Sequence, residues 1–102
     1  MIRHVVMFKF LEENKAENVR RTKEMLDALP AKIPLIRHSE THIGHADATP
    51  ANADLILISD FDSMEDLAAY IVHPDHKAVG AFMRPRRESR CCVDFELKQK
   101  EE

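Results

Sequence analysis

Six histidines stand out in this 102-residue sequence, which contains one tyrosine and no tryptophan. If a helix begins at Pro74, His76 lies in its first turn and shares a face with Val79 and Met83, three and seven residues later. The imidazole then points back toward a sheet, and the helix N-terminus disfavours its charged form, so the ring can accept a proton. Tyr70 can present its hydroxyl to the same space. The pair predicts acid–base chemistry, with ordinary core packing of both rings as the alternative interpretation.

His4 is a second candidate for a ligand-binding side chain. It lies on the strand face that carries Val6 and Phe8, where a polar ring needs a hydrogen-bond partner or a pocket. A core histidine that bonds to backbone or water is the alternative. His73 precedes Pro74 and is expected to cap or link the helices on either side.

The sequence offers weak evidence for metal or cofactor sites. His38, Glu40 and His42 alternate on one strand face, and the glutamate could join the two imidazoles or help to hold a metal. A polar network or a solvated edge is the simpler interpretation. With two glycines in all, the chain has no phosphate-binding loop. We therefore expect no metal and no cofactor.

Charge and cysteine content exclude several classes of partner. The formal net charge of −3 provides no large positive field for nucleic acid, and the basic cluster of Arg84, Arg86, Arg87 and Arg90 is expected to be a solvated loop. No apolar run approaches the ~20 residues of a membrane span. The two cysteines are adjacent, at positions 91 and 92, so they cannot form a disulfide framework, which favours a cytoplasmic location.

The spacing of apolar residues predicts the elements that must position these side chains. Strands are expected over residues 2–10, 35–45, 53–61 and 89–97. A helix follows the first strand, with a capping box from Asn14 to Glu17, and Pro30 and Pro34 are expected to end it. A second helix follows the third strand and is interrupted at Pro74.

The resulting βαββαβ order is that of a ferredoxin-like α+β fold, an antiparallel four-stranded sheet with helices on one face. Leu55-Ile56-Leu57-Ile58 is apolar on both faces of its strand, so the other face of the sheet must be covered as well. A second copy of the sheet is the economical cover, which predicts a homodimer. Residues 1–97 form one domain, and the polar residues 98–102 form a tail.

Two segments of the chain resemble the Dabb family, the stress-responsive dimeric α/β-barrel proteins. They are the opening IRHVVMFKF at 2–10 and YIVHPDH at 70–76, and the closing Val93-Asp94-Phe95 extends the resemblance over nearly the whole chain. The resemblance implies that two ferredoxin-like protomers join their sheets into a dimeric barrel. Most members of the family have no established activity, and one plant member is a polyketide cyclase that performs an intramolecular aldol condensation.

By this resemblance the catalytic roles fall on Tyr70 and His76. His76 would remove a proton next to a carbonyl, and Tyr70 would hydrogen-bond the ring or the developing oxyanion. His4 and His73 occupy the positions of pocket histidines, and the apolar cleft is expected to be lined by Val6, Phe8, Val79 and Phe82. The function implied is binding of a small apolar carbonyl-containing molecule with cyclase-like chemistry. A non-enzymatic stress-associated dimer and a dimeric-barrel monooxygenase are the alternatives.

Overall fold

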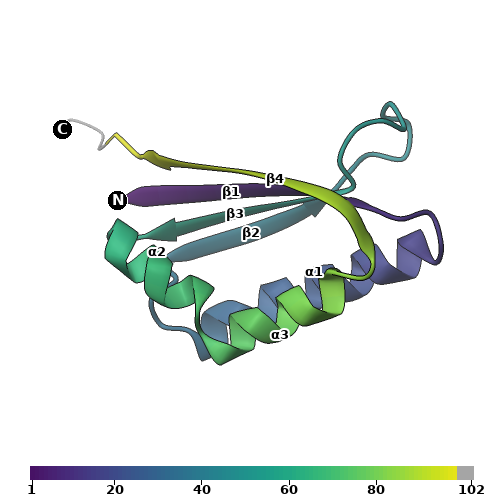
Figure 1. Ribbon diagram of the computed structural model, residues 1–102. Coiled ribbons are helices and arrows are strands. Elements are labelled where there is room, and N and C mark those ends of the chain that lie inside the picture. The colour runs from purple at the N-terminus through teal and green to yellow at the C-terminus, as the bar shows by residue number, and fades with distance from the viewer. Residues whose placement is uncertain (99–102) are drawn as a thin grey trace.

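Residues 1–98, which the computed structural model describes, form a four-stranded sheet with three helices on one face (Figure 1). The elements follow the predicted order, with the second helix divided in two: β1 (Ile2–Phe10), α1 (Lys15–Lys32), β2 (His38–Ile43), β3 (Leu55–Phe61), α2 (Met64–Ile71), α3 (Pro74–Met83) and β4 (Arg87–Glu96). This is the ferredoxin-like α+β fold that the sequence predicts. Of the predicted polar tail, residues 99–102 lie outside the described part of the chain.

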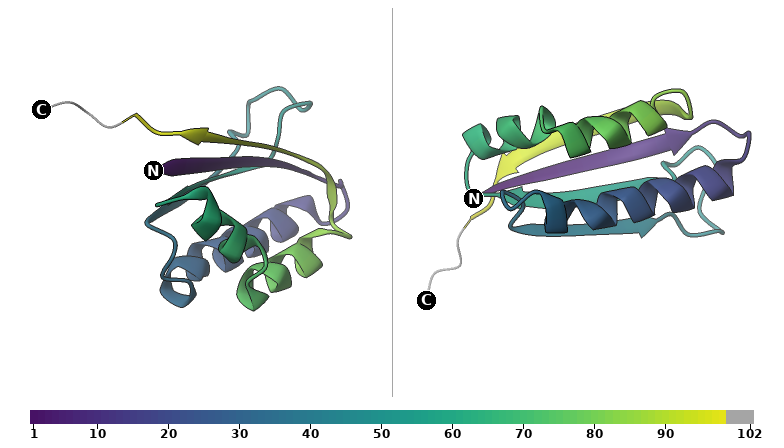
Figure 2. Two further views of the ribbon diagram at one scale, coloured as in Figure 1. Left: turned by 60° about the vertical axis from the view of Figure 1, so that its left-hand side comes forward. Right: turned by 90° about the horizontal axis from the view of Figure 1, so that it is seen from below.

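The sheet has the strand order β2-β3-β1-β4, and all neighbouring strands are antiparallel. On the central strand β1, Val6 lies opposite Leu57 of β3 and Cys92 of β4. Side chains alternate along a strand, so the even-numbered residues of β1, including His4, point to the helices. Figure 2 shows, from below, α1 over β2 and β3, with α2 and α3 along the edge formed by β1 and β4.

The hydrophobic core fills the layer between the sheet and the helices. Each element except β2 and β4 contributes large buried side chains to it, with Ile33 following α1. The core consists of Val6, Phe8, Phe10, Val19, Leu26, Leu29, Ile33, Leu55, Leu57, Phe61, Leu67, Tyr70, Val79 and Met83. Because β4 adds none of these side chains, the layer beneath β4 is occupied by polar groups instead.

The beginning of α1 differs from the prediction, whereas its end lies between the two prolines that were expected to end it. Asn14 does precede the helix, but its backbone is left-handed (φ 54°) and its side chain makes no capping hydrogen bond. The expected capping box is therefore wrong, and Glu17 pairs with Arg20 instead. The helix also continues past Pro30 to Lys32. Proline there removes one N–H donor in the last turn, which the helix tolerates close to its end.

The break between α2 and α3 has the predicted cause. His73 has an extended backbone (φ −65°, ψ 137°), and its Nδ1 atom accepts a hydrogen bond from the Asp75 backbone N–H at 3.1 Å. Pro74 is then the first helical residue, where its missing N–H costs no helical bond. The break turns α3 so that it runs beneath the sheet toward β4 (Figure 1).

Strand ends are less accurately predicted than strand positions. The first strand has the predicted bounds, whereas β2 is shorter than residues 35–45 at both ends. The Ile36 N–H bonds to the Ile33 carbonyl in a turn, so pairing with β3 begins only near Arg37. The third strand begins at Leu55 rather than residue 53, and the last covers 87–96 rather than 89–97.

The sheet face away from the helices carries apolar side chains that nothing covers in residues 1–98. Met7, Val93 and Phe95 are exposed there, and Val5 and Ile58 are half-buried between them. Val5 lies opposite both Ile58 and Val93, so these side chains form a continuous apolar surface, named here the outer face. None of the described helices is long and apolar enough to cross a membrane.

Candidate functional site

A cavity of about 280 Å³ lies between α3 and the strands β1 and β4. Its lining combines an apolar floor with basic side chains: His4, Val6, Phe8, Leu26, Leu57, Ile71, His76, Val79, Gly80, Met83, Arg84, Arg87 and Arg90. Five of the residues expected in a cleft, His4, Val6, Phe8, His76 and Val79, thus line one cavity. A larger hollow of about 690 Å³ lies between α1 and the 44–54 loop, but it contains neither His4 nor His76.

His76 lies half-buried in the first turn of α3, and its ring faces this cavity. Its Nδ1 atom is 3.0 Å from the carbonyl oxygen of Ile71, which can only accept a hydrogen bond. This contact assigns the proton to Nδ1 and leaves Nε2 as a hydrogen-bond acceptor. Burial lowers the pKa of His76 below its ordinary 6.5; the hydrogen bond to the Ile71 carbonyl opposes this effect, and the positive charge of Arg90 adds to it. The ring is therefore neutral at pH 7 and able to accept a proton.

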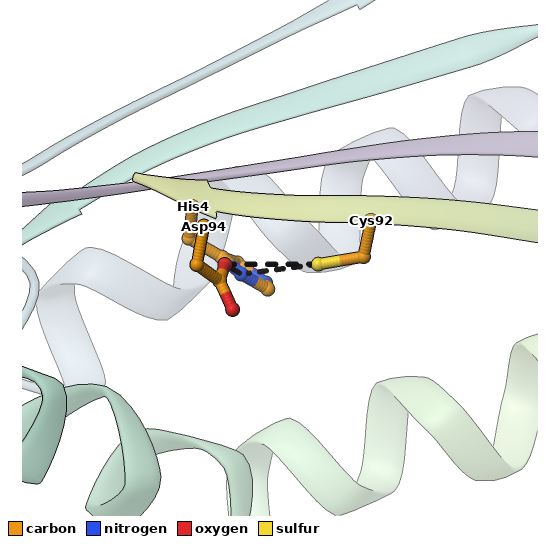
Figure 3. Close-up of side chains that lie close together, drawn as sticks. All are labelled: His4, Cys92 and Asp94. Carbon is orange, nitrogen blue, oxygen red and sulfur yellow. Dashed lines mark hydrogen bonds and ion pairs between the residues drawn. The ribbon is translucent and has the colours of Figure 1, made fainter. Parts of the chain in front are cut away.

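His4 is buried on β1, and its hydrogen-bond partner comes from the neighbouring strand. Its Nδ1 atom is 2.5 Å from Oδ1 of Asp94, the residue directly opposite it on β4. Figure 3 shows both side chains pointing from the sheet into the layer above α2 and α3. A carboxylate accepts the Nδ1 proton, so Nε2 of His4 is again the free nitrogen. The two histidines of the cavity are thus held in the same tautomer by different partners.

Cys92 completes a cluster of three donor atoms around His4. Its Sγ atom lies 3.5 Å from Nδ1 of His4 and 3.7 Å from Oδ1 of Asp94 (Figure 3). Nitrogen and oxygen ligands of one zinc ion lie about 3.3 Å apart, given bonds of about 2.0–2.1 Å, so the His4–Asp94 contact is too short for two ligands and has the length of a hydrogen bond. Burial and Asp94 raise the pKa of the Cys92 thiol. We therefore describe the cluster as a histidine–aspartate pair beside a protonated thiol.

Tyr70 packs beside the cavity rather than into it. Its side chain is 1% exposed, and its ring centroid lies 4.5 Å from that of His76 and 6.2 Å from that of His4. Tyr70 is not among the lining residues of the cavity. Burial raises its pKa, so the phenol keeps its proton. The structure thus brings the expected Tyr70 and His76 together, with the tyrosine behind the histidine.

Two other expected residues lie away from the cavity. Phe82 is on the opposite side of α3, where the guanidinium groups of Arg86 and Arg21 lie 4.0 and 4.9 Å from its ring centroid. The expectation that it lines the cleft is therefore wrong, because the docking of α3 turns position 82 toward α1. His73 has the capping role that its position before proline predicts, and it does not line the cavity.

The stripe of His38, Glu40 and His42 forms a polar network on the outer side of the sheet. Oxygens of Glu40 lie 2.8 Å from Nε2 of His42 and 2.6 Å from Nε2 of His38. These hydrogen bonds lower the pKa of Glu40 to about 2, and the bond to His42 has the larger effect. The stripe points away from the cavity and takes no part in the site.

Three cavity residues, Arg84, Arg87 and Arg90, were expected to be part of a solvated loop. Arg84 and Arg90 are indeed exposed and Arg87 is half-buried, but all three also line the cavity, which the sequence did not indicate. Strand alternation does place Arg90 on the same face as Cys92 and Asp94, but only the pairing of Arg90 with Phe8 shows that this face points to the helices. Asp94 was missed for the same reason.

Similarity to known proteins identifies the family of this chain. Residues 2–97 match the family described as the Stress responsive A/B Barrel Domain. The chain belongs to this family. The A/B barrel chain is also 32% identical over 79 residues to a stress-response A/B barrel domain-containing protein of Arabidopsis thaliana. That match covers 78% of the A/B barrel chain and 30% of the length of the Arabidopsis protein.

Solved structures extend the similarity to known dimers. A dimeric protein of unknown function from Bacteroides fragilis is 35% identical, with a TM-score of 0.86, covering 94% of this A/B barrel chain and 95% of that one. A dimeric ferredoxin-like protein of unknown function from Thermobifida fusca is 30% identical, with a TM-score of 0.83 and coverages of 94% and 90%.

Proposed function

We propose that this A/B barrel protein binds a small carbonyl-containing molecule in the cavity and that His76 removes a proton next to the carbonyl group. The observation that carries the proposal is that His76 and His4 line one cavity with their Nδ1 atoms bonded to acceptors. Each ring therefore has its Nε2 atom free for a ligand. The apolar floor formed by side chains such as Val6, Phe8 and Val79 supports an organic ligand rather than a hydrated ion.

The proposed step is an enolisation. Nε2 of His76 takes a proton from the carbon next to the carbonyl, and the electrons of the C–H bond move to form an enolate. Attack of the enolate carbon on a second carbonyl group forms a C–C bond, and the proton on His76 returns to the new alkoxide. This sequence is an aldol reaction and needs no redox partner.

Tyr70 is proposed to position His76 rather than to touch the ligand. Its buried ring contacts the imidazole from one side, while the Ile71 carbonyl holds the Nδ1 proton. Two contacts from the end of α2 thus fix a ring that belongs to α3. Loss of the tyrosine ring would let His76 rotate away from its productive orientation.

We further propose that two copies of the chain join through the outer face. The exposed Met7, Val93 and Phe95 support this interface, because a large apolar patch on a stable domain usually marks a contact surface. The dimeric relatives support it as well. The exposed free thiols of Cys91 and Cys92 support a reducing, cytoplasmic environment.

Proton exchange tests the proposed chemistry without knowledge of the natural substrate. The protein is incubated in D₂O with small ketones, and deuterium incorporation next to the carbonyl is followed by ¹H NMR. We expect catalysed exchange that falls by about 10²–10⁴-fold in His76→Gln, the usual contribution of a general base. His42→Gln is the matched control, since His42 lies on the outer side of the sheet. Exchange that is the same in His76→Gln and the unmodified protein would refute the role of His76 and favour a non-enzymatic dimer.

A further inference from the structure

We propose that Arg84, Arg87 and Arg90 bind a carboxylate group of the ligand, so that the molecule held in the cavity is a small keto acid. The carbonyl group of this ligand rests on the proposed function, whereas the carboxylate site is supported by the arginines alone. The sequence motif around Tyr70 and His76 does not require a carboxylate site.

The three arginines reach the cavity from the end of α3 and the first residues of β4. Arg84 follows the last residue of α3, and its Nη2 atom lies 3.6 Å from the position that a β-carbon on Gly80 would occupy. The side chain therefore folds back along the helix over a glycine that itself lines the cavity. Arg87 begins β4, and Arg90 lies on the helix-facing side of that strand, opposite Phe8. The end of the helix and the start of the strand thus place three arginine side chains at one cavity.

These arginines differ from Arg3, Arg20 and Arg37 in that they have no carboxylate partner, a feature that Arg21 and Arg86 share within residues 1–98. Arg3, Arg20 and Arg37 each form an ion pair with aspartate or glutamate. None of the ion pairs found within residues 1–98 includes the three cavity arginines.

The charges in the cavity wall repel one another. Burial lowers the pKa of Arg87, and the charges of Arg90 and Arg84 lower it further. Asp94, which lies on the same face of β4 as Arg90, forms its hydrogen bond with His4. Arg87 is half-buried, whereas Arg84 and Arg90 are exposed. A cluster of like charges without a carboxylate partner favours binding of an anion, which would relieve the repulsion.

The shape of the cavity selects the class of anion. Guanidinium is planar and binds a carboxylate through two parallel N–H···O bonds. The cavity volume of about 280 Å³ is just below the range of about 300–1,000 Å³ that is typical of drug-sized ligands. A ligand of this size that also reaches His76 must carry its acid and its carbonyl group close together. A short-chain keto acid satisfies both requirements.

Binding of levulinate tests the carboxylate site. Levulinate has a ketone and a carboxylate, and its methyl ester keeps the ketone without the charge. Saturation-transfer NMR titrations on the whole protein give both dissociation constants. We expect levulinate to bind at least tenfold more tightly than the ester. The preference should disappear in the double variant Arg87→Gln/Arg90→Gln. It should persist in Arg86→Gln, which removes one charge from the same turn at a side chain stacked on Phe82 outside the cavity.

The outcomes separate the two proposals. Equal binding of acid and ester, or an equal loss of preference in Arg86→Gln, would overturn the carboxylate site. Displacement of levulinate by lower concentrations of inorganic phosphate would overturn the keto acid assignment in favour of a phosphate ester.

Circular dichroism melts show whether each variant is folded. If the double variant unfolds, Arg90→Lys, which keeps the positive charge, is tested in its place. If deuterium exchange of neutral ketones depends on His76, the proposed function stands even when the arginine variants show no carboxylate binding. Arginine-dependent binding without exchange would support the carboxylate site and refute the enolisation.

Discussion

The pairing of His4 with Asp94 leads to a quantitative prediction about stability. The His4 side chain is 5% exposed and that of Asp94 is 28% exposed, with 2.5 Å between Nδ1 and Oδ1. A hydrogen bond to a charged partner contributes about 1.5–3 kcal/mol, and removal of the acceptor leaves a buried N–H group that water cannot readily reach. Because Asp94 is partly solvated, we expect Asp94→Ala to lower the free energy of unfolding by about 2 kcal/mol. Asp94→Asn keeps a neutral acceptor and should cost about half as much.

Urea denaturation at a fixed protein concentration measures these changes, since a dimer would make the midpoint depend on concentration. Glu96→Ala is the matched control. Glu96 lies two residues further along β4 on the same face, but its side chain is 73% exposed and its ion pair with the N-terminus spans 3.7 Å. Such an exposed pair should contribute no more than about 0.5 kcal/mol.

A double-mutant cycle decides whether the cost of Asp94→Ala comes from the histidine. If His4 is first replaced by leucine, no buried N–H group remains to lose its partner, and Asp94→Ala should then cost less than about 0.5 kcal/mol. The reasoning would be refuted if Asp94→Ala cost the same in both backgrounds, or no more than Glu96→Ala in the unmodified protein.

Three further predictions concern other features of the fold. Ser59→Ala should raise the free energy of unfolding by about 1 kcal/mol in urea denaturation, because the Ser59 hydroxyl is buried without a hydrogen-bond partner in residues 1–98; a clear loss would show that the hydroxyl is satisfied. The free energy of unfolding should fall as the pH drops below about 6.5. His76 has a lowered pKa in the folded chain, so the unfolded chain binds this proton at a higher pH than the folded chain does. Urea midpoints from pH 7.5 to 5 should depend less on pH in His76→Gln, and an unchanged dependence would contradict this. Val5→Lys should convert the proposed dimer to monomer in sedimentation velocity, whereas Glu24→Lys on the exposed side of α1 should not; a dimer that survives Val5→Lys would place the interface elsewhere.

Local sequence patterns determined the elements and the faces of their side chains. The period-two alternation of residues 2–10 places His4 beside Val6 and Phe8, as the structure confirms. The position of Pro74 predicts both the break after α2 and the place of His76 in a first helical turn. These features depend on interactions within a few residues of one another, so the sequence carries them directly. Even here, one proline does not fix the end of a helix, since α1 passes Pro30 and ends at Lys32, before Pro34.

The tertiary structure alone decided which side chains meet in the site. Asp94 lies 90 positions from His4 in the sequence and reaches it only through the register of β1 and β4. A shift of one residue in this register would turn Asp94 to the outer face. The same register brings Arg90 under the sheet. The rotation of α3 against the sheet then sends His76 into the cavity and Phe82 out of it. Register and helix rotation are set by the whole packed core at once, so no local pattern in the sequence could specify them.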